Sequence, residues 1–133
     1  MSTCEEEERM ADEHNNQMVV MEKSLLDLVV ESWRFSKVFL RVLAKLDAGE
    51  STRYLGQYRW YVKRINELLE DAGYRLVNLE GTIYDPGMAI TPLNVDEFSP
   101  NDKLYVDQMI EPIIMGKEGL VKTGTVILKR VEK

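Results

Sequence analysis

The feature that most constrains the fold is an apolar repeat between about residue 17 and residue 48. Its members follow one another at alternating steps of three and four residues, the rhythm of a coiled-coil seam. They are Leu25, Leu28, Ser32, Phe35, Phe39, Val42 and Leu46. A second apolar stripe, which includes Val29, Val30 and Trp33, makes this face wider than a two-stranded seam. The repeat therefore predicts a helix that contacts more than one neighbour, as in a helical bundle.

A second helix is predicted directly after the first. We expect the first helix to end with Gly49 as a left-handed cap. Ser51 or Thr52 would cap the second helix, which runs to about Ala72 before Gly73 stops it. Because the link between them is short, the two helices should form an antiparallel hairpin. A dimer of such hairpins would be a four-helix bundle.

After Gly73 the sequence becomes rich in β-branched residues, prolines and glycines, which is typical of strands and turns. Candidate strands cover residues 74–79, 88–93, 103–114 and 120–131. Pro112 is a candidate break in the third, because proline has no N–H for the ladder. The sequence thus predicts an α+β fold, with a helical hairpin over residues 16–73 and a small antiparallel β domain over residues 74–133.

Residues 1–15 are polar and acidic, and they show no periodic pattern. The acids there are Glu5, Glu6, Glu7, Glu8, Asp12 and Glu13. Such a run is typical of a disordered tail, which we predict for this segment. These side chains account for most of the net charge of −6. Binding to nucleic acid or to an anionic membrane surface needs clustered Lys and Arg, so neither is expected as a partner.

The chain offers little for catalysis. Its one histidine, His14, and its one cysteine, Cys4, both fall in the predicted tail, which cannot hold them in a fixed geometry. Two such ligands are too few for a structural zinc site. The sequence contains no phosphate-binding glycine motif. We therefore predict a protein that is not an enzyme and that has no catalytic residue, metal site or cofactor.

The sequence also favours a reducing compartment. Cys4 can form no disulfide within one chain, and the acidic N-terminus is unlike a signal peptide. No apolar run reaches the roughly 20 residues that span a membrane. The expected location is the cytoplasm.

The aromatic residues of the second helix suggest a subunit contact. Tyr54, Tyr58 and Tyr61 share its apolar stripe, whereas Trp60 lies off that stripe. Interleaved Arg and Lys residues would allow nucleic-acid bases to stack on these rings, but helical packing explains the spacing better. Trp60 is therefore a candidate contact with a second copy. The residues expected to pair two copies are Leu25, Leu28, Phe35, Phe39, Val42, Leu46, Tyr58 and Trp60.

Three motifs of the β half carry a resemblance to a known family. Tyr84-Asp85-Pro86 is an aromatic-Asp-Pro turn before a strand, residues 106–109 read Val-Asp-Gln-Met, and residues 119–127 read GLVKTGTVI. With the order long helix, shorter helix, β domain, they resemble GrpE, the nucleotide-exchange factor of DnaK-type chaperones. The family has Arg-Pro where this chain has Thr123-Gly124, and its paired helical stalk is longer. The resemblance is thus to a divergent, truncated member.

The resemblance implies a homodimer that forms through the helices. Its β domain would wedge into the ATPase domain of a DnaK-type chaperone and promote nucleotide exchange, without performing chemistry. The methionines of the β half suit such a surface, because their side chains adapt to varied partners. The residues expected to meet the partner are Tyr84, Asp85, Pro86, Met88, Asp107, Met109, Glu111, Met115 and Val121. Two alternatives stay open: a non-enzymatic adaptor or regulatory protein whose β domain binds an unrelated protein, and an enzyme that uses β-domain carboxylates.

Overall fold

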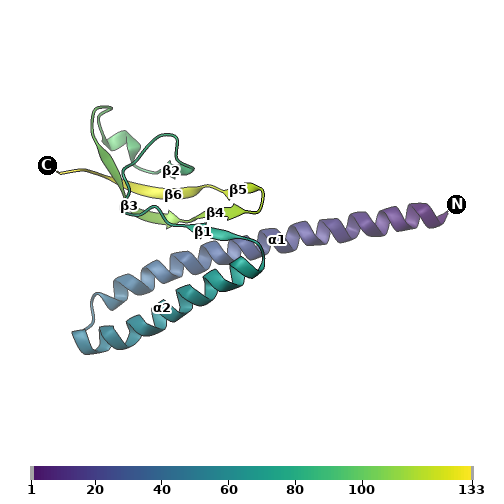
Figure 1. Ribbon diagram of the computed structural model, residues 1–133, viewed down its shortest axis with the longest axis horizontal. Coiled ribbons are helices and arrows are strands. Elements are labelled where there is room, and N and C mark those ends of the chain that lie inside the picture. The colour runs from purple at the N-terminus through teal and green to yellow at the C-terminus, as the bar shows by residue number, and fades with distance from the viewer. Residues whose placement is uncertain (1, 133) are drawn as a thin grey trace. The chain divides into compact units, whose positions relative to one another are not determined.

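The computed structural model describes residues 2–132. Two helices come first, α1 (Ser2–Leu43) and α2 (Ala48–Asp71), and short strands follow (Figure 1). The strands are β1 (Arg75–Val77), β2 (Ile90–Pro92), β3 (Leu104–Glu111), β4 (Ile113–Gly116), β5 (Gly119–Lys122) and β6 (Gly124–Arg130), with the 3-10 helix η1 (Val95–Glu97) after β2. This order confirms the predicted α+β class. The chain divides between Ser32 and Trp33 into two compact units.

Helix α1 begins much earlier than the apolar repeat does. It starts at Ser2, so the prediction of a disordered tail is wrong for residues 2–15, and residue 1 lies outside the described residues. Glu and Ala favour helix, and acids near a helix N-terminus interact favourably with the helix dipole. No Gly or Pro occurs before Gly49, so nothing in this stretch breaks the helix.

The link between the helices differs from the prediction. Asp47 is the N-cap of α2, and its side chain accepts a hydrogen bond from the backbone N–H of Glu50 at 2.9 Å. Gly49 therefore lies inside α2 and is not a left-handed cap, and neither Ser51 nor Thr52 is the N-cap. An aspartate at the N-cap adds a charge that the helix dipole favours. Gly73, with φ of 90°, follows the end of α2, as predicted.

The strands form two three-stranded sheets instead of one antiparallel sheet. One has the order β1-β4-β5 and the other the order β2-β6-β3. The pairing of β2 with β6 is parallel, and Ile90 lies opposite Gly124, whereas the other pairs are antiparallel. The predicted break at Pro112 is confirmed, because it separates β3 from β4. A second break at Thr123 separates β5 from β6, so one predicted strand is two.

The core of the second unit lies among the strands. Its buried members are Leu104, Val106, Met109, Ile113, Val126 and Leu128, and Trp33 of α1 packs against them. Gly124 lets β6 approach β3 closely. A Cβ at this position would lie 2.6 Å from Cε of Met109 and 3.0 Å from the carbonyl oxygen of Glu111. The core thus joins the last turns of α1 to strands β3 and β6.

Candidate interaction surfaces

The apolar seam of α1 is largely exposed. In the first unit, Leu28 has 67% of its surface exposed, and Leu25 is also exposed. In the second unit, Phe35 is 65% exposed and Val42 is exposed too. The same steps of three and four lead back to Met21 and Met18, which are exposed and which the sequence reasoning left out. Exposed large apolar side chains at regular spacing are typical of a surface that another chain covers.

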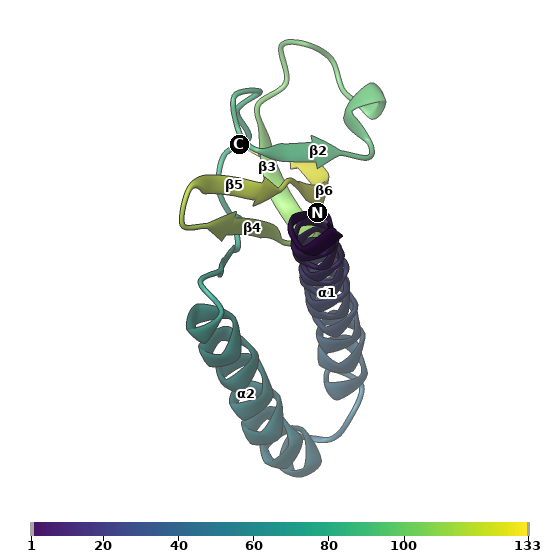
Figure 2. The same cartoon turned by 90° about the vertical axis from the view of Figure 1, so that its right-hand side faces the viewer.

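The second unit has an apolar groove between α1 and α2, whose cavity volume is about 650 Å³. Figure 2 shows the last turns of α1 and helix α2 as two arms joined by residues 44–47. The lining residues are Phe35, Ser36, Phe39, Arg53, Gly56, Gln57, Tyr58, Trp60 and Tyr61. Four residues predicted to pair two copies therefore line one groove, and Trp60 is 66% exposed there. Leu46 is half-buried in the link between the helices.

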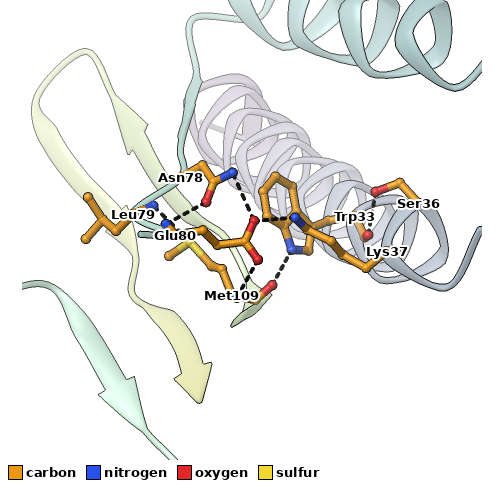
Figure 3. Close-up of polar contacts among 7 residues, drawn as sticks. All are labelled: Trp33, Ser36, Lys37, Asn78, Leu79, Glu80 and Met109. Atoms are coloured by element: carbon orange, nitrogen blue, oxygen red, sulfur yellow. Dashed lines mark hydrogen bonds and ion pairs between the residues drawn. The ribbon is translucent and has the colours of Figure 1, made fainter. Parts of the chain in front are cut away.

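One turn of α1 is attached to the backbone of β3 (Figure 3). The indole Nε1 of Trp33 donates to the carbonyl oxygen of Met109 at 2.8 Å, and Nζ of Lys37 pairs with the carboxylate of Glu80. Glu80 in turn accepts a hydrogen bond from the backbone N–H of Met109 at 3.0 Å. Both backbone polar groups of Met109 are thus bound by side chains, one from α1 and one from the segment after β1.

Glu80 is the centre of this cluster. It also accepts from Nδ2 of Asn78 at 3.2 Å, and its own N–H donates to Oδ1 of Asn78 at 3.0 Å. Burial alone raises the pKa of Glu80. The hydrogen bonds from Lys37, the Met109 N–H and Asn78, with the charge of Lys37, outweigh burial and hold that pKa below its ordinary value. Glu80 is therefore ionised at neutral pH, and Lys37 lies both beside it and 4.7 Å from the centre of the Trp33 ring.

The outer edge of β3 is covered along most of its length. The backbone of residues 81–84 hydrogen-bonds to it: Gly81 N–H donates to the carbonyl oxygen of Val106, and Val106 N–H donates to that of Thr82. Tyr84 N–H donates to the carbonyl oxygen of Leu104. At Met109, β3 shifts register against β6 on either side, so its backbone groups are free to bind Trp33 and Glu80. These two side chains continue the cover of the outer edge. A covered edge cannot accept a strand from another chain.

The structure separates the predicted partner-binding residues into exposed and buried ones. Asp85, Pro86 and Val121 are exposed, and the Asp85 side chain accepts from the N–H of Gly87 at 3.0 Å within its turn. Tyr84 and Met115 pack against the core, and Met88 is half-buried.

The remaining three predicted residues on β3 behave differently from one another. Asp107 pairs with Lys129, and Glu111 pairs with both Arg34 and Lys122. Met109 is only 1% exposed, so its predicted place on a binding surface is wrong. The register shifts on either side of it turn its side chain into the core, and simple alternation along a strand does not foresee such a shift.

Several exposed apolar residues of the β part, which comprises residues 74–132, were not predicted. They are Ile83, Leu93, Val95 and Leu120. Short loops and short strands give no periodic signal from which exposure can be read. Leu120 is next to the predicted Val121 on β5, so both sides of that strand carry an exposed apolar side chain.

Comparison with protein-family models, curated proteins and solved structures found no match to this chain. Among the described residues, no three His, Cys, Asp or Glu side chains come together as a metal-binding group. Within the same residues, no helix has the length and apolar character needed to cross a membrane.

Proposed function

We propose that this protein is a GrpE-like co-chaperone that pairs through its helices and promotes nucleotide exchange on a DnaK-type ATPase. The division of its apolar surface carries the proposal. The β part closes a core against Trp33 of α1, whereas the helices leave a regular seam and a groove exposed. The order of long helix, shorter helix and compact β part, which contributed to the resemblance to GrpE, is the order of the elements in the structure.

A second copy of the chain is the partner that fits the helices best. A seam with steps of three and four needs an opposite seam of the same kind, and another α1 supplies one. Burying a side chain such as Leu28, Phe35 or Trp60 contributes about 1.5–3 kcal/mol, so a few such residues from each copy favour association strongly. The groove between α1 and α2 gives the bundle its further contacts.

The β part then meets the chaperone. Asp85, Pro86 and Val121 are the predicted contacts that stay exposed. A factor that binds the open state of the ATPase domain more tightly than the closed state shifts the population towards the open state, from which nucleotide leaves. This mechanism needs shape and differential affinity, and it needs no catalytic group.

The pairing of copies is tested by sedimentation equilibrium with a matched pair of variants. Leu28→Asp places a charge in the seam, and Val19→Asp places one on the same helix at a similarly exposed position outside the seam. We expect a dimer for the wild type and for Val19→Asp, and monomers for Leu28→Asp. A monomeric wild type would contradict the pairing of two copies. Equal behaviour of the two variants would contradict pairing through this seam.

The exchange activity is tested by the release of a fluorescent ADP analogue from purified DnaK-type chaperones of the same organism. We expect the wild type to accelerate release and Val121→Asp to abolish the acceleration. Leu93→Asp alters an exposed apolar residue of the β part outside the predicted contacts, and it should retain activity. If the wild type leaves the release rate of every such chaperone unchanged, the exchange function is rejected in favour of an adaptor role.

A further inference from the structure

We infer that Trp33, Lys37 and Glu80 are positioning residues, which form a stiff joint that fixes the β part against the last turns of α1. Their role in exchange rests on the proposed function, whereas the stiffness of the joint does not. The three side chains make one closed cluster (Figure 3). Trp33 and Lys37 stand one helical turn apart, and each is tied to Met109, directly or through Glu80.

The attachment is rigid because one link ends on a backbone atom and the other ends on a carboxylate that is held in place. Trp33 binds the carbonyl oxygen of Met109 directly, and the Glu80 carboxylate that Lys37 pairs with is itself held by the Met109 N–H and by Asn78, so it cannot rotate away freely. The Met109 side chain is held as well. It is buried, and its Sδ accepts from the N–H of Leu79 at 3.5 Å. A joint made to this residue is therefore made to the core of the β part.

Two points of attachment also restrict rotation. Positions 33 and 37 are about 6 Å apart along the helix axis, and a body held at two such points cannot turn about one of them. Lys37 lies over the Trp33 ring, so each of the two points supports the other. Arg34 adds an ion pair to Glu111 of β3 at 3.0 Å. All of these contacts lie within a single turn of α1.

A stiff joint matters for an exchange factor that opens a cleft. The β part can dock through its own surface whatever its angle to the helices, but it shifts the ATPase towards the open state only if that angle is kept. A loosened joint should therefore lower the maximal rate of nucleotide release. It should change much less the concentration of factor that gives half of that rate. A general loss of folding would affect both quantities.

The test uses the full chain with Trp33→Phe and Glu80→Ala. Trp33→Phe keeps an apolar ring in the core but removes the Nε1–H donor, and Glu80→Ala removes the acceptor of Lys37 and Met109. Glu67→Ala is the control, because it removes ion pairs to Lys63 and Arg64 that lie within α2. Lys37→Arg keeps the charge and the contact with the ring, and it should preserve the joint.

The stiffness is measured first, without a chaperone. Spin labels at Lys45→Cys and Asn101→Cys, in a Cys4→Ser background diluted with unlabelled protein, report the distance between the end of α1 and the β part. We expect Trp33→Phe and Glu80→Ala to broaden the distance distribution severalfold, with Glu67→Ala and Lys37→Arg as narrow as the wild type. An unchanged width in the first two variants overturns the joint.

Nucleotide release is measured second, against the concentration of factor. We expect the maximal rate to fall severalfold for the two joint variants while the half-maximal concentration stays within a small factor of the wild type. Broadened distances with an unchanged maximal rate overturn the role in exchange. If the wild type itself does not accelerate release, the proposed function fails, and the distance distributions alone decide whether the joint exists.

Discussion

The apolar seam of the helices and the core of the β part differ sharply in how much of their surface is exposed. Val106, Ile114 and Val126 of the β part have none of their surface exposed, whereas Leu28, Phe35 and Trp60 of the helices are about two-thirds exposed. The β part thus buries a core within the chain, although Ile83, Leu93, Val95 and Leu120 stay exposed at its surface. The seam residues of the helices stay exposed, and the spacing of Leu28 and Phe35 is that of a coiled-coil seam, which the proposed pairing of two copies would cover.

The largest expected effect separates a core leucine from a seam leucine. Leu128→Ala leaves a cavity in a fully enclosed core and should lower the free energy of unfolding by about 2–5 kcal/mol at every protein concentration. Leu28→Ala should lower it only where dimers are present, so its effect should vanish on dilution. Denaturant unfolding at several concentrations, followed by tryptophan fluorescence, measures both. A concentration-dependent effect of Leu128→Ala would show that the core around Leu128 also depends on the pairing of two copies.

A pair of glycines gives the next largest effect, with opposite signs in the two regions. In Gly124→Ala the new Cβ would meet the Glu111 carbonyl oxygen and the Ile113 side chain, so we expect a loss of about 1–3 kcal/mol. Gly56 in α2 has no atom within 4 Å of such a Cβ. Gly56→Ala should stabilise the helix by about 0.5–1 kcal/mol, because alanine loses less backbone entropy there. Thermal unfolding of the monomeric Leu28→Asp variant, followed by circular dichroism, checks both signs, because in a dimer the second copy would occupy the groove that Gly56 lines. Destabilisation by Gly56→Ala in that background would contradict the prediction.

The sequence predicted the parts of the fold that depend on local pattern. The spacing of Leu25 to Leu46 identified the first helix, Gly73 marked the end of the second, and Pro112 marked a break between strands. Each of these signals acts over a few residues, through helical periodicity or through the backbone limits of Gly and Pro.

The parts that depend on distant residues were missed. The hydrogen bond between Trp33 and Met109 joins positions that are 76 residues apart, and nothing near either residue announces it. The parallel pairing of β2 with β6 is of the same kind. The start of α1 was missed for another reason: a run of acids has no apolar period, yet it is compatible with helix, so the lack of a pattern did not mean the lack of structure.

The N-cap of α2 offers a smaller effect, and it tests a corrected prediction. Asp47→Ala removes the acceptor for the Glu50 N–H and should lower stability by about 1 kcal/mol. Ser51→Ala, at the position where the sequence pattern placed the cap, is the matched control and should have almost no effect. Helical content and thermal unfolding measure the difference. Equal effects of the two changes would contradict the role of Asp47 as the N-cap of α2.

The smallest effect lies where the two regions meet, at Glu80. Burial would raise its pKa, but hydrogen bonds from Lys37, Met109 and Asn78 lower it below the ordinary glutamate value of 4.5. A carboxylate with a lowered pKa in the folded state binds protons more weakly there than in the unfolded chain, so it stabilises the fold at higher pH. That contribution is complete above the unfolded pKa and is lost as the pH falls through the folded one.

Glu80→Gln should therefore be less stable than the wild type by a constant amount above pH 4.5, and the gap should narrow below it. The Glu80→Gln side chain can still accept a hydrogen bond from the Met109 N–H, so the packing of the joint changes little while its charge is lost. Glu67→Gln removes a carboxylate from ion pairs within α2 and is the control. Denaturant unfolding at steps of pH measures the gap. If it stays constant into acid for Glu80→Gln, the charge on Glu80 does not hold the two regions together, and the joint rests on the indole of Trp33 and the packing around Met109.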